Sequence, residues 1–124
     1  MGKRSSDRFL DAPADLIIAN CNKQVALSAE PTSYTEANAT YALADVAMSS
    51  GDFTKANGDS SGRKCTIAAK SGVPVDVSGT VTHAALLDTS NSQVDEVNTT
   101  ASQAVAAGGT VDIGSWKFEF GDPA

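Results

Sequence analysis

Short apolar segments separated by turn residues recur along most of this chain, and this spacing is the feature that most constrains its fold. The clearest segment covers residues 116–120, where Trp116, Phe118 and Phe120 share one face of an extended strand and two charged residues share the other. Turn signals such as Asn57-Gly58 recur every ~8–12 residues, as in β-sandwiches and jelly rolls. The sequence therefore predicts a mainly β fold of about eight or nine short strands.

Small residues dominate the composition and support that prediction. Ala, Ser, Thr, Val and Gly supply 65 of the 124 residues, whereas Leu and Ile together supply 10. Such a composition favours thin, close-packed β layers, because the core of a helical bundle needs more large aliphatic side chains. The length fits one domain of the usual ~100–150 residues, and we assign residues 9–124 to a single β-sandwich domain.

The individual strands are predicted from alternation and from turn residues. Residues 80–88 are apolar on both faces around Ala84–Leu87, which indicates a core strand. Pro74 confines the strand at 73–77 to an edge or to a position whose amide is not needed, and residues 93–98 alternate poorly, which indicates a bulge or an irregular edge. The remaining predicted strands cover residues 24–28, 41–48, 63–69, 103–105, 111–113 and 116–120, with a hairpin framed by 51–54 and 57–62 and a loop or helical turn at 32–40.

One helix is predicted, over Arg8–Asn22, and it is expected to pack on the edge or face of a sheet. Asp11 is the expected cap, and Pro13 is tolerated in the first turn. The residues at helical spacing are Leu10, Ala14, Ile17 or Ile18, and Cys21.

Residues 1–8 form the predicted flexible, basic N-terminal arm, with Lys3, Arg4 and Arg8 available to reach an acidic neighbour; a merely solvated tail stays open. The formal charge of −6 opposes nucleic-acid binding, which needs a cationic surface. The longest uncharged run, Val97–Val111, is too polar for a membrane span, and no apolar stretch of a secretory signal follows the basic start. We therefore expect synthesis in the cytoplasm and neither nucleic acid nor membrane as a partner.

Two cysteines, Cys21 and Cys65, stand 44 positions apart, which excludes a C-x-x-C redox or zinc motif. The simplest expectation is two small buried thiols. A disulfide within one chain or between neighbouring copies stays open, because proteins that leave the cytosol also leave its reducing conditions.

No residue pattern points to catalysis, a cofactor or a metal site. His83 lies inside the predicted core strand, where a structural role is expected. Asp95 and Glu96 are adjacent, so in a regular strand they point to opposite faces and cannot flank one glycosidic bond unless a bulge redirects them. The oxygen-bearing residues Asp52, Asn57 and Asp59 do not match a calcium-binding loop and suit turns instead. The sequence predicts a protein that is not an enzyme.

Five stretches carry a resemblance to known proteins: residues 8–12, 28–34, 51–54, 82–88 and 109–120. In these stretches, which span nearly the whole chain, the sequence resembles a family of small phage virion proteins encoded among structural genes. The segment Thr82-His83-Ala84-Ala85-Leu86-Leu87-Asp88 and the late aromatic segment are the most specific. The chain departs from the family at residues 91–96, where relatives tend to have an apolar strand, and in its extra basic residues at the N-terminus.

The resemblance implies a structural role in the virion, and two functions follow from it. The first is a capsid decoration or cement protein that binds the major capsid protein or other virion proteins, as a homo-oligomer or symmetric array, through its arm and a sheet edge. The alternative is a tail fibre or spike module that binds a host-surface glycan, with Tyr34 and Tyr41 as the aromatic platform.

Overall fold

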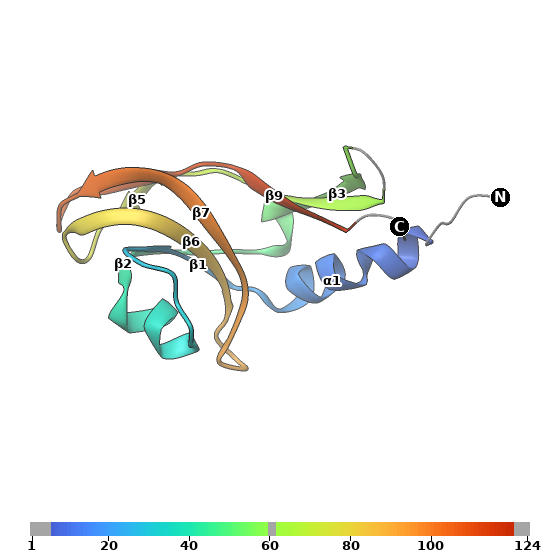
Figure 1. Ribbon diagram of the computed structural model, residues 1–124, viewed down its shortest axis with the longest axis horizontal. Helices are drawn as coiled ribbons and strands as arrows, with labels where there is room; N and C mark the ends of the chain where they lie inside the picture. Colours follow the sequence, from blue (N-terminus) through green and yellow to red (C-terminus); the bar gives the residue numbers. More distant parts are fainter. Residues whose placement is uncertain (1–5, 60–61, 121–124) are drawn as a thin grey trace.

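The computed structural model describes residues 6–59 and 62–120, and in these residues the protein is mainly β and β-sandwich-like, as predicted. One N-terminal helix precedes nine strands that form antiparallel sheets (Figure 1). The elements are α1 (Asp7–Asn20), β1 (Lys23–Leu27), a π-helical turn (Glu36–Thr40), β2 (Ala42–Ala47), a 3₁₀ turn (Ser50–Asp52), β3 (Phe53–Asn57), β4 (Arg63–Ile67), β5 (Lys70–Pro74), β6 (Gly79–Asp88), β7 (Gln93–Val105), β8 (Thr110–Ile113) and β9 (Trp116–Phe120).

The largest sheet has the strand order β2-β1-β6-β7. Its central strands β1 and β6 are buried on both faces, and Ala84–Leu87 of β6 are at most 1% exposed. This confirms the core strand predicted at residues 80–88, because a strand with neighbours on both sides and on both faces has no polar face.

A three-stranded sheet, β3-β4-β9, forms the other layer together with α1, which packs on β4 and β3. In β9 the aromatic side chains are half-buried and the charged ones are exposed, as the alternation predicts. Trp116 and Phe118 pack against the core, and Phe118 meets Phe120 edge-on with ring centroids 5.7 Å apart. The strand therefore closes the core, as expected.

The helix starts earlier than predicted, and Asp11 does not cap it. Ser6 is the N-cap, and its Oγ accepts a hydrogen bond from the backbone N–H of Phe9 at 3.2 Å. Pro13 consequently lies inside the helix and not in its first turn, and Arg8 belongs to the helix and not to a flexible arm. The other arm residues, Lys3 and Arg4, lie outside the described residues.

The region predicted as two segments, residues 93–98 and 103–105, is one strand, β7, at the edge of the four-stranded sheet. The predicted irregularity is confirmed, since the pairing of β6 with β7 shifts register twice. Leu86 pairs with Glu96 and Leu87 with Val94, so Asp95 is an extra residue. A second shift, between Val81 and His83, leaves three residues of β7 opposite one of β6.

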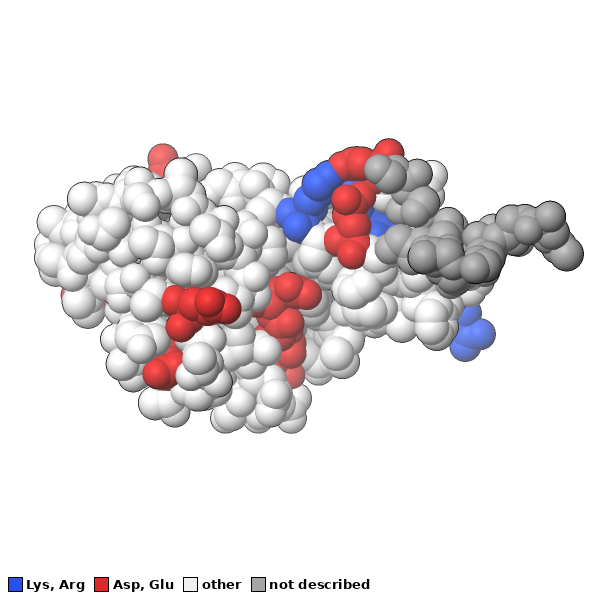
Figure 2. All heavy atoms as spheres, in the orientation of Figure 1, with Lys and Arg blue, Asp and Glu red and all other residues white. Residues whose placement is uncertain are grey.

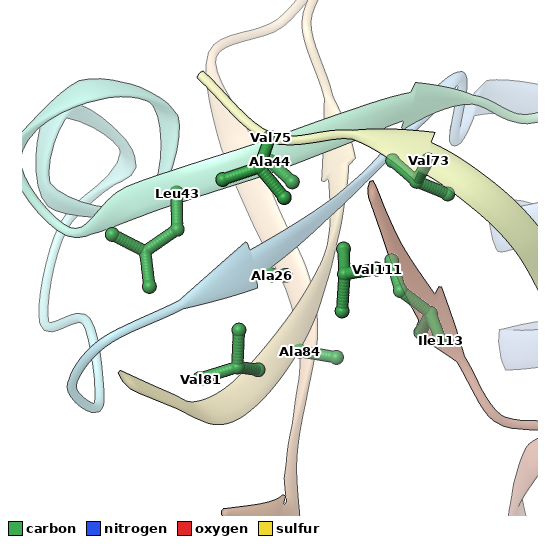
Figure 3. Packing of buried hydrophobic residues seen from close by; sticks show 9 residues of the cluster. All are labelled: Ala26, Leu43, Ala44, Val73, Val75, Val81, Ala84, Val111 and Ile113. Atoms are coloured by element: carbon green, nitrogen blue, oxygen red, sulfur yellow. The ribbon is translucent and has the colours of Figure 1, made fainter. Parts of the chain in front are cut away.

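The strand predicted at residues 73–77 lies earlier, as β5 (Lys70–Pro74), and Pro74 ends it. Because β5 pairs with β8 in a separate two-stranded sheet, the predicted edge position is confirmed, although the predicted bounds are wrong. The side chains of these two strands pack on the inner face of the four-stranded sheet. Figure 3 shows this packing, in which two small residues, Ala26 of β1 and Ala84 of β6, lie among larger aliphatic side chains.

Candidate functional site

His83, the one histidine of the chain, is half-buried on β6, and its Nδ1 lies 2.8 Å from Oγ1 of the adjacent Thr82. Neither cysteine hydrogen-bonds to it within the described residues: the Cys21 thiol donates instead to Oδ2 of Asp95 at 3.0 Å. Within residues 6–59 and 62–120, no three His, Cys, Asp or Glu residues gather closely enough to hold a metal ion. The groups inspected in the sequence are therefore not assembled into a nucleophile–base pair.

Both cysteines are free and buried, in the same hydrophobic cluster. Burial, followed by the hydrogen bond and negative charge of Asp95, raises the pKa of the Cys21 thiol far above its ordinary value. Burial is also the main cause that raises the pKa of Cys65. Thiols held in the protonated form are poor nucleophiles and slow to exchange, so the geometry matches the simplest expectation of two separate thiols.

The sequence predicts that Asp95 and Glu96, as adjacent residues of a strand, point to opposite faces. The bulge at Asp95 breaks this alternation, because an extra residue is inserted there. Both side chains are half-buried, and burial, together with the charge of Asp95, raises the pKa of the Glu96 carboxyl. Asp95 is occupied by the Cys21 thiol. The Asp95 carboxylate therefore interacts with the core of the protein itself.

The three residues considered for calcium hold the β3–β4 region together. Asp52 caps the 3₁₀ turn by accepting from the Ser49 N–H at 2.8 Å, and it also pairs with Lys70 at 2.8 Å. The Asn57 Oδ1 accepts from Arg63, and Asp59 pairs with Lys64 at 2.7 Å and also with Lys117. Each of these three side chains thus interacts with a side chain or backbone group of the protein.

The two tyrosines proposed as a glycan platform do not line the same groove. Both are half-buried and pack against one cluster under the outer face of the four-stranded sheet. Tyr34 lines an open groove of about 450 Å³ between residues 31–34 and the start of β7, whereas Tyr41 is absent from its lining. The platform predicted from two tyrosines is therefore reduced to Tyr34.

Helix α1 has a second apolar face that sequence inspection missed. Leu10, Ala14 and Ile17 are buried against the sheet, but Phe9 is 70% and Leu16 58% exposed. These two residues are seven apart and fall within about 20° of each other around the helix axis. The signal for this exposed face in the sequence is that Phe9 and Leu16 are apolar but lie outside the helical stripe predicted to be buried.

The inner face of α1 is held to the sheet by ion pairs as well as by packing. The Nε of Arg63 donates to Oδ1 of Asp11 at 2.9 Å, and the Nζ of Lys55 donates to Oδ1 of Asp15 at 2.7 Å. The first pair is largely buried, with side chains 18% and 12% exposed. The outer face of the helix is thus presented on a fixed support.

The two ends of the molecule differ in charge on the face shown in Figure 2. The end that carries α1, β3 and β9 shows Lys and Arg next to Asp and Glu, whereas the end formed by β5, β6 and β7 shows Asp and Glu. The net charge of −6 is therefore unevenly distributed.

A cleft of about 310 Å³ opens where β7 faces β8 and the start of β9. Its floor is apolar, and the side chains at its rim are amides, hydroxyls and one carboxylate, Asp112. The floor is deep because the central strands carry Ala26 and Ala84 there, and the rim is irregular because β7 has extra residues opposite Thr82. The floor consists of Ala26, Val81, Ala84, Val111 and Ile113.

The described helix is too short and too polar to cross a membrane. Comparisons of the chain with protein-family models, with curated proteins and with solved structures found no match.

Proposed function

We propose that this protein is a structural component of a phage particle, a decoration or cement protein that binds the outer capsid shell. The observation that supports a docking role is the exposed apolar face of α1, formed by Phe9 and Leu16. The resemblance of the sequence to small virion proteins supports the particle as the setting, with the major capsid protein as the partner.

The size of the exposed face suits a contact that is repeated many times. Burying a Phe or Leu side chain fully contributes roughly 1.5–3 kcal/mol, so two of them supply a modest anchor at each site. On a capsid the same contact recurs at every symmetry-related position. A large number of modest contacts stabilises a shell without requiring a large interface from a small protein.

The fixed support of the helix lowers the cost of docking. Association loses free energy when flexible side chains and segments must be ordered. Because Asp11, Asp15 and the buried stripe already hold α1 on the β3-β4-β9 sheet, the helix needs no ordering when its outer face binds. Arg8, exposed beside Phe9, adds a positive charge next to the apolar face for an acidic neighbour.

A capsid-pelleting assay tests the proposal. Purified protein is mixed with expanded capsids that lack it, and the double variant Phe9→Ser, Leu16→Ser is expected to lose at least tenfold in affinity. Val77→Ser is the matched control, because Val77 is also exposed (52%) but lies on the β5–β6 connection. Wild-type protein that stays in the supernatant at every concentration would refute the capsid role.

The groove at Tyr34 supports the alternative function, a tail fibre or spike module that binds a host-surface glycan. An aromatic ring beside hydroxyl and amide groups is the usual composition of a sugar site, and Tyr34 lies there with Thr32, Ser33 and Gln93. Saturable binding to host cells that Tyr34→Ala abolishes and Tyr41→Ala retains would favour this function over capsid binding.

A further inference from the structure

The cleft between β7 and the β8–β9 segment lies where all three sheets end. In the order of each sheet, β7, β8 and β9 are terminal strands, so among the described residues each pairs with a strand on one side only. Unpaired strand edges present rows of free N–H and C=O groups. Residues of all three terminal strands line the cleft, so it is bordered by strands that each have an unpaired edge, around an apolar floor.

From this arrangement we infer that the cleft is a binding site for an extended peptide segment of another protein, which adds a strand between β7 and β8–β9. Strand addition gives affinity through main-chain hydrogen bonds and specificity through pockets that receive alternate side chains. That the donor is a virion protein rests on the proposed function, whereas the chemistry of the segment rests on the cleft alone.

The rim is chemically suited to a peptide backbone. The side-chain amides of Asn98 and Gln103 make no hydrogen bond to any other described residue, and both line the cleft. A carboxamide offers both donors and an acceptor, which match a peptide N–H and C=O. On the opposite wall the Asp112 Oδ1 accepts from the Gly72 N–H at 2.9 Å, which fixes that carboxylate beside the cleft.

The floor selects the side chains of the segment. Successive residues of a strand point to opposite sides, so every second residue would face the floor. Val81, Val111 and Ile113 make this floor apolar, and Ala26 and Ala84 leave it room. The volume of about 310 Å³ is at the lower end of the ~300–1,000 Å³ of ligand pockets, which suits small aliphatic side chains.

Charge selects the flanks of the segment. The lining of the cleft contains no Lys, Arg or His, and its one charged residue is Asp112. Further along β7 stand Asp95 and Glu96, which make no ion pair within the part of the chain that the structure describes. Acidic flanks would be repelled. The partner segment is therefore neutral or basic, with Val-sized side chains at alternate positions.

Two properties of the chain make the site testable. Trp116 is the one tryptophan in the sequence and lines the cleft, so its fluorescence reports occupancy. Gly114 also lines the cleft, and a Cβ built on it meets nothing within 4 Å, so Gly114→Tyr adds a bulky side chain at the cleft from a position that has room for the Cβ. Gly51 is equally open but lies in the 3₁₀ turn, away from the cleft, which makes Gly51→Tyr the matched control.

The experiment is a fluorescence titration of the isolated full-length protein with a blocked heptapeptide, Lys-Val-Thr-Val-Thr-Val-Lys. We expect a saturable change in Trp116 fluorescence that weakens at least tenfold in Gly114→Tyr and is unchanged in Gly51→Tyr. The peptide with Glu in place of Lys, and the peptide N-methylated at alternate amides, should both bind at least tenfold more weakly.

Several results would overturn the inference: no saturable signal, equal binding by Gly114→Tyr, or equal binding by the N-methylated peptide, which would leave apolar contact without strand pairing. A neutral oligosaccharide whose signal depends on Gly114 would assign the cleft to carbohydrate. A dimer lost in Gly114→Tyr during sedimentation would assign it to a second copy. None of these measurements uses capsids, so the cleft can fail while capsid pelleting succeeds, and the reverse.

Discussion

At the end of the molecule formed by α1 and the β3-β4-β9 sheet, acidic side chains are matched by basic ones on neighbouring elements. Asp11 and Asp15 of the helix pair with Arg63 and Lys55 of the strands. On β6 and β7 of the four-stranded sheet, Asp88, Asp95 and Glu96 act electrostatically on the Cys21 thiol, and none of the three forms an ion pair with a described residue.

The two ends also differ in how their apolar surface is arranged. The helical end buries one face of α1 and exposes the other as a convex ridge at Phe9 and Leu16. The sheet end opens instead as a concave cleft over Ala26 and Ala84. A ridge that is locked in place suits insertion into a partner, whereas a cleft with free edges suits reception of one. The two proposals therefore assign two separate contacts to one small domain.

The largest expected effect contrasts two isoleucines. Ile67→Ala at the helical end should cost about 2–5 kcal/mol in the free energy of unfolding, because Ile67 is 0% exposed in a closed cluster. Ile113→Ala should cost clearly less, because its side chain borders the cleft and solvent can enter the vacated volume. Urea denaturation measures both. Equal costs would mean that the cleft is closed in solution.

A hydrogen bond between side chains links the two ends. The Trp116 Nε1–H of β9 donates to Oε1 of Gln24, a fully buried residue of β1, at 2.8 Å. Gln24→Leu leaves this donor unpaired and should cost about 1–3 kcal/mol. In the Trp116→Phe background, which lacks the donor, the same change should cost less. A double-mutant cycle by urea denaturation measures the coupling, and an additive result would contradict the link.

The ion pairs of the helical end differ in burial, and their strengths should differ accordingly. Asp11→Asn should cost about 1–2 kcal/mol, because its pair with Arg63 is largely shielded from water. Asp15→Asn should cost less than about 1 kcal/mol and lose its effect in high salt, because Asp15 is 55% exposed. Thermal unfolding at low and high salt separates them. The reverse order would show that α1 is held from its exposed side.

The pH dependence of stability should have opposite signs in the two regions. Burial raises the pKa of Glu96 above 4.5, so its contribution is most favourable below that pH and is lost as pH rises through the raised value. Hydrogen bonding to Lys70 lowers the pKa of Asp52 below 3.8, so its contribution is present above that pH and is lost as pH falls through the lowered value.

Glu96→Gln should therefore raise the melting temperature slightly at neutral pH and leave it unchanged in acid, whereas Asp52→Asn should lower it at neutral pH and converge with wild type in acid. Circular dichroism melts between about pH 3 and pH 7 measure both profiles. A Glu96→Gln variant that is less stable at neutral pH would show that the carboxylate has a favourable partner.

Local patterns that span two or three residues were enough to predict the structural features that depend on which side chains are buried. The core strand around Ala84–Leu87 and the alternation of β9 followed from which positions are apolar. The buried apolar stripe of the helix also followed from the sequence, but the N-cap did not. Ser6 and Asp11 are both favourable cap residues, and Asp11 instead accepts a hydrogen bond from Arg63, fifty-two positions further along the chain. Pairing over that separation leaves no trace in local periodicity.

The candidate site was beyond sequence reasoning for the same reason. The cleft depends on alanines in two strands that become neighbours only in the sheet, and on a register shift in β7 that local alternation cannot place. Residues Val97–Val111 form an uncharged run in the sequence. The first half of this run becomes an open sheet edge only because β7 is the terminal strand of its sheet. Topology, and not composition, turns that run into a surface.

The smallest expected effect concerns the two buried thiols, Cys21 and Cys65, which lie in the same hydrophobic cluster. Burial raises the pKa of both thiols, and the acids around Cys21 raise its pKa further, so at neutral pH neither is a thiolate. A thiol reagent should leave both unmodified in the native protein and modify both in urea, and mobility on a non-reducing gel should not change on reduction. If one thiol reacts in the native state, it should be Cys65. The positive charge of Lys55 partly offsets the effect of burial on the pKa of Cys65, whereas Asp95 raises the pKa of Cys21 further. Faster labelling of Cys21 would show that its surroundings open more readily than those of Cys65, and a reducible band would establish the disulfide that the sequence left open.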